Sequence, residues 1–157
     1  MKFIADSMLG KLARWLRMLG YNVKYADRLD DKILIEIAKT EDRVLLTRDL
    51  ELYRQAINQH VQAFLVEEKT EAGRLAALAK RYCLVLELDP NTSRCSKCNA
   101  EIRPAEKDAI SDRIPSSTKT FYNEFWECTN CEQIYWQGSH WKRISQSLKE
   151  AKELLKK

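Results

Sequence analysis

Short apolar runs alternate with helical patterns over the first 88 residues of the chain. Runs rich in aliphatic or β-branched residues predict strands over residues 2–5, 22–25, 43–47 and 61–66. Between them, apolar residues recur at spacings of three and four, as they do on one face of a helix. This alternation is typical of βα units arranged around a parallel sheet.

Three helices are expected in the same part of the chain. The first has one apolar face and ends at a glycine, with the face made by Leu9, Leu12, Leu16 and Leu19. The second begins at Asp30 or Asp31, either of which can cap it, and the third covers residues 70–82. Residues 83–86 fit either a last strand or the exit to a following module.

A polar, turn-forming segment at residues 89–93 marks the end of this region. The part that follows has little helical periodicity, and a charged helix closes the chain from Trp141 to Lys157. The chain is therefore expected to have three parts: a main domain over residues 1–88, a small module over 89–142 and a C-terminal helix over 143–157.

Four of the five cysteines form two CxxC motifs, separated by residues 99–127. The motifs consist of Cys95 with Cys98 and Cys128 with Cys131. Each short turn can direct two sulfurs to one tetrahedral ion, and four protein ligands leave no open position for water. A structural zinc is therefore expected, with an iron–sulfur cluster or two separate redox pairs as the alternatives. Cys83 stands alone in an apolar run, which predicts a buried thiol.

Composition adds limits to this picture. The 157 residues are 45% hydrophobic and 32% charged, which is enough for one real core and a small appended module. The apolar runs are too short to span a membrane, and no secretory pattern opens the chain. Together with an odd number of cysteines, this favours a cytoplasmic protein with thiols or metal ligands. The net charge of +4 permits a polyanionic partner without requiring one.

Acidic residues stand where the strands of a parallel sheet would bring them together. Asp6 follows the first strand, and Asp49 lies just beyond the third, with Glu51 in reserve two residues later. Asp30 or Asp31 opens a helix that must begin at the same edge of the sheet. Side chains just past the carboxyl ends of strands line the crevice used for chemistry in such sheets. Converging carboxylates repel one another unless a cation lies between them, so Mg²⁺ or Mn²⁺ is expected here.

Basic residues accompany these acids. Lys11, Arg14 and Arg17 are spaced by three and should share the flank of the first helix that the leucines leave free, where they would bind phosphate. Arg48 is adjacent to Asp49 and is expected to add a contact. Taken singly, each residue has an ordinary explanation as a cap, a turn former or part of a solvated face. The combination points to a metal-dependent site that acts on a phosphodiester.

Half of the aromatic residues lie between residues 121 and 141. Aromatic rings can stack on nucleobases. In a small module they more often form the hydrophobic core and the contact with a neighbouring domain, which is the interpretation that we prefer. His140, close to a predicted helix start, could meet a phosphate there, although an ordinary cap-region histidine is the better expectation.

Several of these segments resemble the PIN-like ribonucleases, and most closely the Mut-seven carboxy-terminal ribonuclease family. The resemblance rests on Phe3-Ile4-Ala5-Asp6, Leu9 to Arg17, Leu19-Gly20-Tyr21, Asp31 with Leu34 and Ala38, and Arg43 to Asp49. In the second half it rests on Arg94 to Asn99, Phe125 to Cys131 and Tyr135 to Trp141. It extends from Lys2 to about Ile144 and implies a three-layer α/β/α PIN-like domain followed by a zinc ribbon.

The resemblance also implies metal-dependent cleavage of RNA, with the acids of the family at Asp6, Asp31 and Asp49. The chain departs from the common pattern at Glu51, where PIN nucleases often have aspartate. The alternative is a zinc-ribbon adaptor that binds RNA or the ribosome without cutting. A nucleotide-binding domain is disfavoured because no GxGxxG or GxxxxGK[ST] run is present. RNA is the expected partner, and the sequence leaves monomer or homodimer open.

Overall fold

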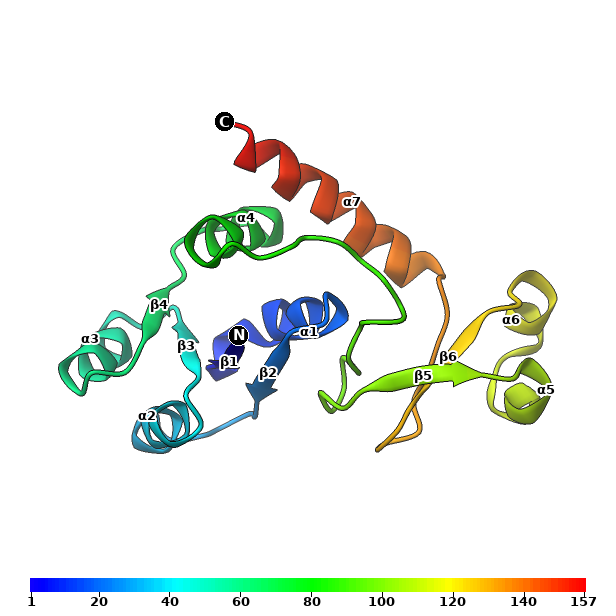
Figure 1. Ribbon diagram of the computed structural model, residues 1–157, viewed down its shortest axis with the longest axis horizontal. Coiled ribbons are helices and arrows are strands. Elements are labelled where there is room, and N and C mark those ends of the chain that lie inside the picture. The colour runs from blue at the N-terminus through cyan, green and yellow to red at the C-terminus, as the bar shows by residue number, and fades with distance from the viewer.

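Four parallel strands form the sheet of the larger part of the molecule, shown at the left and centre of Figure 1. The computed structural model describes all residues from 1 to 157. The strands lie in the order β2-β1-β3-β4, and their bounds are Lys2–Ala5 for β1, Asn22–Tyr25 for β2, Val44–Thr47 for β3 and Ala63–Leu65 for β4. Ala5 at the end of β1 is in register with both Tyr25 and Leu46, so three strands end together at one edge of the sheet.

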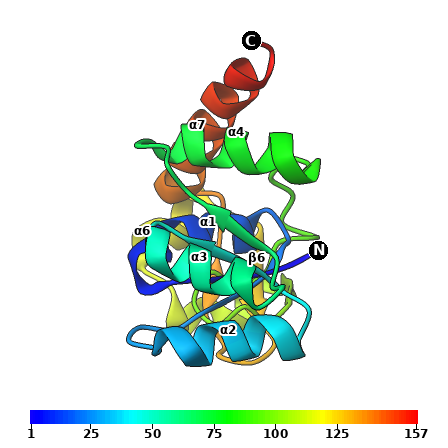
Figure 2. The ribbon, with the colours of Figure 1, turned by 90° about the vertical axis from the view of Figure 1, so that its left-hand side faces the viewer.

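Helices cover both faces of this sheet (Figure 2). Buried residues of α1, α4 and α7 form one cluster with one face of the sheet, and those of α2 and α3 form a second cluster with the other face. The bounds are Gly10–Met18 for α1, Asp31–Thr40 for α2, Leu50–Asn58 for α3, Glu71–Tyr82 for α4 and Ser139–Leu155 for α7. This arrangement confirms the predicted three-layer α/β/α fold.

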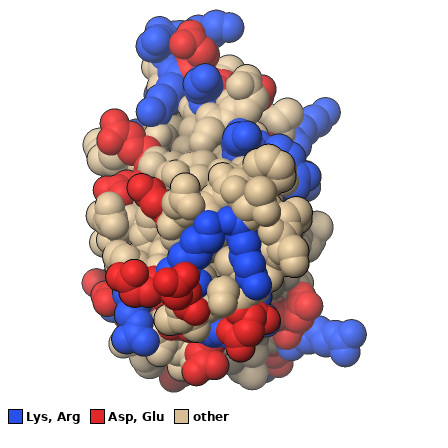
Figure 3. Space-filling view, turned by 90° about the vertical axis from the view of Figure 1, so that its right-hand side faces the viewer, with Lys and Arg blue, Asp and Glu red and all other residues tan.

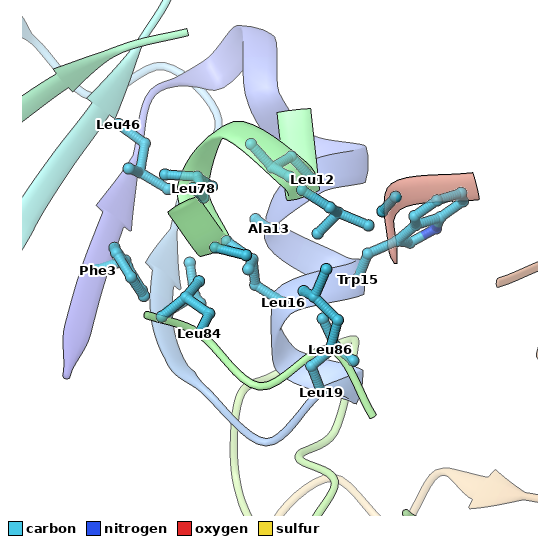
Figure 4. Packing of buried hydrophobic residues seen from close by; sticks show 14 of the residues in the cluster. Phe3, Leu12, Ala13, Trp15, Leu16, Leu19, Leu46, Leu78, Leu84 and Leu86 are labelled. Atoms are coloured by element: carbon cyan, nitrogen blue, oxygen red, sulfur yellow. The ribbon is translucent and has the colours of Figure 1, made fainter. Parts of the chain in front are cut away.

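The C-terminal helix α7 is part of the main core. Ile144, Leu148 and Ala151 are buried in the same cluster as the leucines of α1. Figure 4 shows Leu12 and Leu16 of α1 in this cluster, with Trp15 turned toward the ribbon of α7. The helix begins two residues before the predicted start, and Leu155 in its last turn is 41% exposed. Its last turns extend beyond the helices that cover the other residues of its apolar face (Figure 1).

The sequence pattern missed helix α3, which connects β3 to β4. Only Leu52 and Ala56 of this helix are buried, so its apolar face is too narrow to stand out. Asp49 caps the helix and would have been the available signal. Asp49 therefore lies two residues after β3 and is also the N-cap of α3.

Residues 83–88 form the exit from the main domain and contain no strand. Leu84 and Leu86 are buried in the main core on the way out. Cys83, expected to be buried, is exposed instead. It ends α4 with φ of 55°, and this left-handed conformation turns the side chain away from the buried face of the helix.

The small module contains a three-stranded antiparallel sheet in the order β5-β6-β7, seen at the right of Figure 1. Its strands are Ile102–Ala105 for β5, Phe125–Cys128 for β6 and Ile134–Tyr135 for β7. Two short helices, α5 (Lys107–Ile110) and α6 (Ser116–Phe121), occupy the long segment between the two CxxC motifs. A separate cluster around Phe125 forms the core of this module. None of the helices in the molecule is both long and apolar enough to cross a membrane.

Candidate functional site

The four cysteines of the CxxC motifs come together at one end of the small sheet. The ligand atoms of Cys95, Cys98, Cys128 and Cys131 all lie within 4.8 Å of one another. The Sγ atoms of Cys95 and Cys131 are 3.6 Å apart, and those of Cys98 and Cys128 are 3.4 Å apart. A tetrahedral zinc with bonds of about 2.3 Å separates its sulfurs by about 3.8 Å. The cluster therefore fits a structural zinc of the ribbon type.

Backbone amides support this interpretation of the cluster. The N–H groups of Asn130 and Cys131 both donate to Cys128 Sγ at 3.4 Å. Such bonds stabilise sulfur as a thiolate, which is the form that binds metal. The prediction of one four-cysteine cluster is confirmed, and it excludes two separate redox pairs.

The first CxxC motif is joined to the edge of the main sheet. Asn99 follows the motif and accepts a hydrogen bond from the backbone N–H of Val23 in edge strand β2, at 3.0 Å. Its amide nitrogen donates to Asn22 Oδ1 at 2.9 Å. Asn99 adopts φ of 74°, a conformation that asparagine tolerates well. Asn99 thus pairs with a backbone N–H of the edge strand that would otherwise be unpaired.

Arg17 also joins the two parts, which corrects its expected role. Its Nε donates to the carbonyl of Val23 at 2.8 Å, and its Nη1 donates to the carbonyl of Ser96 at 3.0 Å. The residue is only 5% exposed. Burial lowers the pKa of Arg17, and the negative charges of Cys95 and Cys98 oppose this change. The expectation that Arg17 binds phosphate is wrong, because its guanidinium is used inside the molecule.

Replacing Arg17 with leucine is expected to lower the free energy of unfolding by about 2–3 kcal/mol, because two hydrogen bonds from a charged donor are lost. Arg14→Leu is the matched control on the same helix, since Arg14 is exposed and the structure gives it no ion pair. Its effect should stay within about 0.5 kcal/mol. Urea unfolding of both variants checks the difference, and equal stabilities would contradict the assigned role of Arg17.

Asp6 is held in place at the carboxyl end of β1. It is 6% exposed, and its Oδ1 accepts a hydrogen bond from the N–H of Met8 at 3.0 Å. Its Oδ2 accepts from the hydroxyl of Thr47, the last residue of β3. The same Thr47 Oγ1 accepts from the N–H of Asp49 at 2.9 Å. Thr47 therefore connects two acids from distant parts of the sequence.

Asp49 and Asp31 each stand at the start of a helix. Asp49 Oδ1 accepts from the backbone N–H groups of Glu51 and Leu52, at 2.9 and 3.3 Å. Asp30 is the cap of α2, because its Oδ1 accepts from the N–H of Lys32 at 3.4 Å. Asp31 is the first residue of α2, and the structure gives its carboxylate no hydrogen bond. The sequence leaves open whether Asp30 or Asp31 is the second acid. Because Asp30 caps the helix, Asp31 is the carboxylate that is available as a ligand.

The acids at this edge are close enough to influence one another. Burial raises the pKa of Asp31, and the nearby charges of Asp49, Asp30 and Asp6 raise it further. No lysine or arginine forms a salt bridge with Asp6, Asp31 or Asp49, since all ion pairs lie elsewhere. Their oxygens are less tightly gathered than the cysteine sulfurs, which are the only group of such ligand atoms within 4.8 Å of one another. The edge therefore has uncompensated negative charge and space between the carboxylates.

The remaining predicted residues lie around these acids. Glu51 is exposed in the first turn of α3, with Oε1 placed 3.5 Å from Gln55 Nε2. Lys11, Arg14 and Arg48 are all exposed, as a phosphate-binding role requires. Lys11 Nζ lies 5.1 Å from the centre of the Trp15 ring, which orients this side chain along α1.

Sequence reasoning missed two residues beside the acids. One is Thr47, described above, and the other is Tyr25 at the end of β2. The hydroxyl of Tyr25 donates to the carbonyl of Ser7 at 3.0 Å and lies 3.0 Å from Asp27 Oδ1. A Cβ atom at Gly10 would lie 2.8 Å from this hydroxyl, so a side chain there would displace the tyrosine ring from its present position. The only available signal was the polar character of Tyr25 and Thr47 at strand ends.

A family model described as Mut7-C RNAse domain matches residues 1–148 of the chain. The chain belongs to the Mut7-C RNAse domain family. The match covers the parallel sheet, the four-cysteine cluster and most of α7, so this Mut7-C RNAse domain includes both parts of the molecule. The resemblance proposed from the sequence is thereby confirmed. Comparisons with curated proteins and with solved structures gave no match.

Proposed function

We propose that this Mut7-C RNAse domain is a metal-dependent endoribonuclease. Its catalytic site would lie at the carboxyl ends of the parallel strands, in the region of Asp6, Asp31 and Asp49 that we call the acidic edge. Asp6, Asp31 and Asp49 would hold Mg²⁺ or Mn²⁺, with Glu51 as an additional ligand. Family membership supports RNA as the substrate. The observation that carries the proposal is that the first three carboxylates lie at one edge, near enough for their charges to act on one another, and that none of them forms an ion pair with a basic residue.

The residues at this edge fit a hard divalent cation. Carboxylate oxygens are its preferred ligands, and Mg²⁺ commonly keeps several waters and binds through only one or two carboxylates. A site of this kind accommodates the open spacing of the acids, which a fully protein-ligated metal would not. The raised pKa of Asp31 is what uncompensated neighbouring charge and burial produce, and a bound cation would relieve it.

A divalent ion in this position supplies charge to offset the phosphate and lowers the pKa of water. The protein residues have separate roles. Thr47 and the N–H of Met8 fix the carboxylate of Asp6 in one orientation. The N–H groups at the start of α3 do the same for Asp49. The exposed cations Lys11, Arg14 and Arg48 would hold the phosphate backbone across the edge.

The second metal is proposed to be zinc, bound by Cys95, Cys98, Cys128 and Cys131. Four sulfurs fill its coordination, so its role is structural. Because the first motif is bonded to β2 through Asn99, the zinc would hold the ribbon against the catalytic domain. The ribbon is thereby fixed in place beside the main sheet.

Cleavage of a circular single-stranded RNA tests the proposed activity, because a molecule without ends can only be opened by an endonuclease. The wild-type protein should linearise it when Mn²⁺ or Mg²⁺ is added and should leave it intact without added divalent ions. Free zinc should not substitute for these ions. Linearisation at the same rate without Mn²⁺ or Mg²⁺ would contradict the proposal.

The open spacing of the acids also favours a second candidate, a domain that binds RNA without cutting it. In that case RNA binding would weaken with salt through the exposed cations and would need no added divalent ion. Binding without any cleavage of the circular RNA in Mn²⁺ would select this alternative.

A further inference from the structure

A second feature of the molecule, away from the acidic edge, is a groove of about 180 Å³ between strand β7 and the start of helix α7. The residues that line it include Met18, Ile134, Trp136, Gly138, His140 and Trp141. It is smaller than the roughly 300 Å³ at which drug-sized pockets begin, and its walls are mainly apolar. The groove therefore suits one planar ring system.

Each of the two tryptophans of the groove packs against a hydrophobic core and is also partly exposed to solvent. Trp136 packs against the core of the small module, with its ring centre 6.2 Å from that of Phe125. Trp141 packs against the main core. Both remain only partly buried. Rigid aromatic rings of this kind bind with little loss of side-chain freedom, as stacking platforms require.

Gly138 leaves room for the ring of Trp136. A Cβ atom at Gly138 would lie 2.8 Å from Trp136 Nε1 and 3.1 Å from its Cδ1, although the backbone conformation of Gly138 is one that any residue adopts. The absence of a side chain is therefore needed for the position of the Trp136 ring.

Three cations act on His140 of the groove. Lys11 and Arg14 on α1, and Arg143 on α7, are exposed and form no salt bridge. Neither α1 nor the first eleven residues of α7 contain an acidic residue. On the end of the molecule that carries the small module, Figure 3 shows acidic and basic side chains interspersed. The groove is thus complementary to an anionic partner that carries flat rings.

Helix α1 connects the groove to the acidic edge. It begins four residues after Asp6, and Met18 at its other end lines the groove. Its nine residues span about 12 Å, which a few nucleotides of single-stranded RNA would cover. Burial lowers the pKa of His140, and Arg143, Arg14 and Lys11 lower it further, so these cations stand around this residue of the groove.

We infer that the groove is a base-stacking subsite for single-stranded RNA, in which Trp136 and Trp141 hold one nucleobase while Lys11, Arg14 and Arg143 contact the phosphates beside it. The inference rests on the proposed function in taking RNA as the substrate. It adds where a nucleotide outside the cleavage site is bound. Stacking accepts any base, so the subsite favours unpaired RNA over duplex without selecting a sequence.

Binding without added Mg²⁺ or Mn²⁺ tests the subsite separately from cleavage. Fluorescence anisotropy would compare a labelled single-stranded RNA with an abasic RNA of the same length, which has the phosphates but no bases. Trp136→Leu keeps an apolar side chain against Phe125 and removes the wide ring. It is expected to weaken binding of the RNA about fivefold to a hundredfold and to leave binding of the abasic strand unchanged.

Two further variants complete the test. Trp136→Phe retains a ring and should recover most of the affinity for RNA. Phe121→Leu removes an aromatic side chain that is 77% exposed on α6, and it should change the binding of neither the RNA nor the abasic strand. Zinc content and thermal unfolding establish that each variant is folded. Equal binding of RNA by Trp136→Leu and wild type, or an equal loss for both strands, would overturn the inference. Metal-dependent cleavage could persist in either case, so the proposed function is judged independently.

Discussion

The Asp6→Asn variant is expected to cleave RNA at least about 10²–10³-fold more slowly than wild type while remaining folded. The substitution removes the charge that the proposed metal requires and keeps the shape of the side chain. Asparagine can still accept the hydrogen bond from Met8 N–H, and Thr47 Oγ1 has a free lone pair for the new amide. Rates of RNA cleavage in Mn²⁺, measured with thermal unfolding in parallel, check the expectation.

Asp42→Asn is the matched control for this experiment. Asp42 is an exposed aspartate in the turn before β3, at the opposite end of the strand from the acidic edge. It adopts φ of 54°, which asparagine also tolerates. The control should cleave RNA at the wild-type rate. If Asp6→Asn retained that rate as well, the acidic edge would not be the catalytic site.

Loss of the proposed zinc is expected to have the largest effect on stability. Cys131→Ser should reduce bound zinc from one per chain to none and lower the free energy of unfolding by more than about 3 kcal/mol. The small module has a minor apolar core of its own, so the cysteine cluster must supply much of its stability. Metal analysis and chemical denaturation measure the two effects.

The disturbance should also reach the main sheet, because Val23 N–H is bonded to Asn99 beside the first motif. Hydrogen exchange at the Val23 amide is therefore expected to accelerate in Cys131→Ser. Cys83→Ser makes the same chemical change at the one cysteine outside the cluster, which is exposed, and should alter neither zinc content nor exchange. Zinc retention by Cys131→Ser with unchanged stability would contradict a structural four-cysteine site.

Local pattern was enough to predict the sheet and the cysteine cluster. Strand β1 has the predicted bounds, and the central strands β1 and β3 read as apolar runs because a sheet covered on both faces buries nearly all of their residues. The CxxC spacing brings two sulfurs together by covalent geometry alone. The signals for both features lie in short stretches of the chain, so the sequence displays them directly.

Features that depend on tertiary contacts were missed. Arg17 has the spacing of an exposed flank, yet its partners are carbonyls of Val23 and Ser96, which only the docking of the small module brings near. Cys83 lies in an apolar run but ends a helix in a left-handed conformation, so its side chain faces solvent. In both cases the spacing of apolar residues predicted the helix, whereas the environment of the side chain depended on the tertiary structure around it.

The acidic edge could be predicted from the sequence only in part. Strand topology was sufficient to predict that Asp6 and Asp49 face the same edge, because both follow parallel strands that end together. The distinction between Asp30 and Asp31 required the cap geometry of α2. The contribution of Thr47 required knowledge of the register between β1 and β3, which no local pattern contains.

The most direct measurement is a crystal structure of the protein soaked in Mn²⁺, with anomalous differences recorded to locate manganese. We expect a manganese peak between the carboxylates of Asp6, Asp31 and Asp49, which form no ion pair, and a zinc peak among the four cysteines. Manganese absent from the acidic edge, in crystals of a protein that cleaves RNA when Mn²⁺ is added, would contradict this expectation.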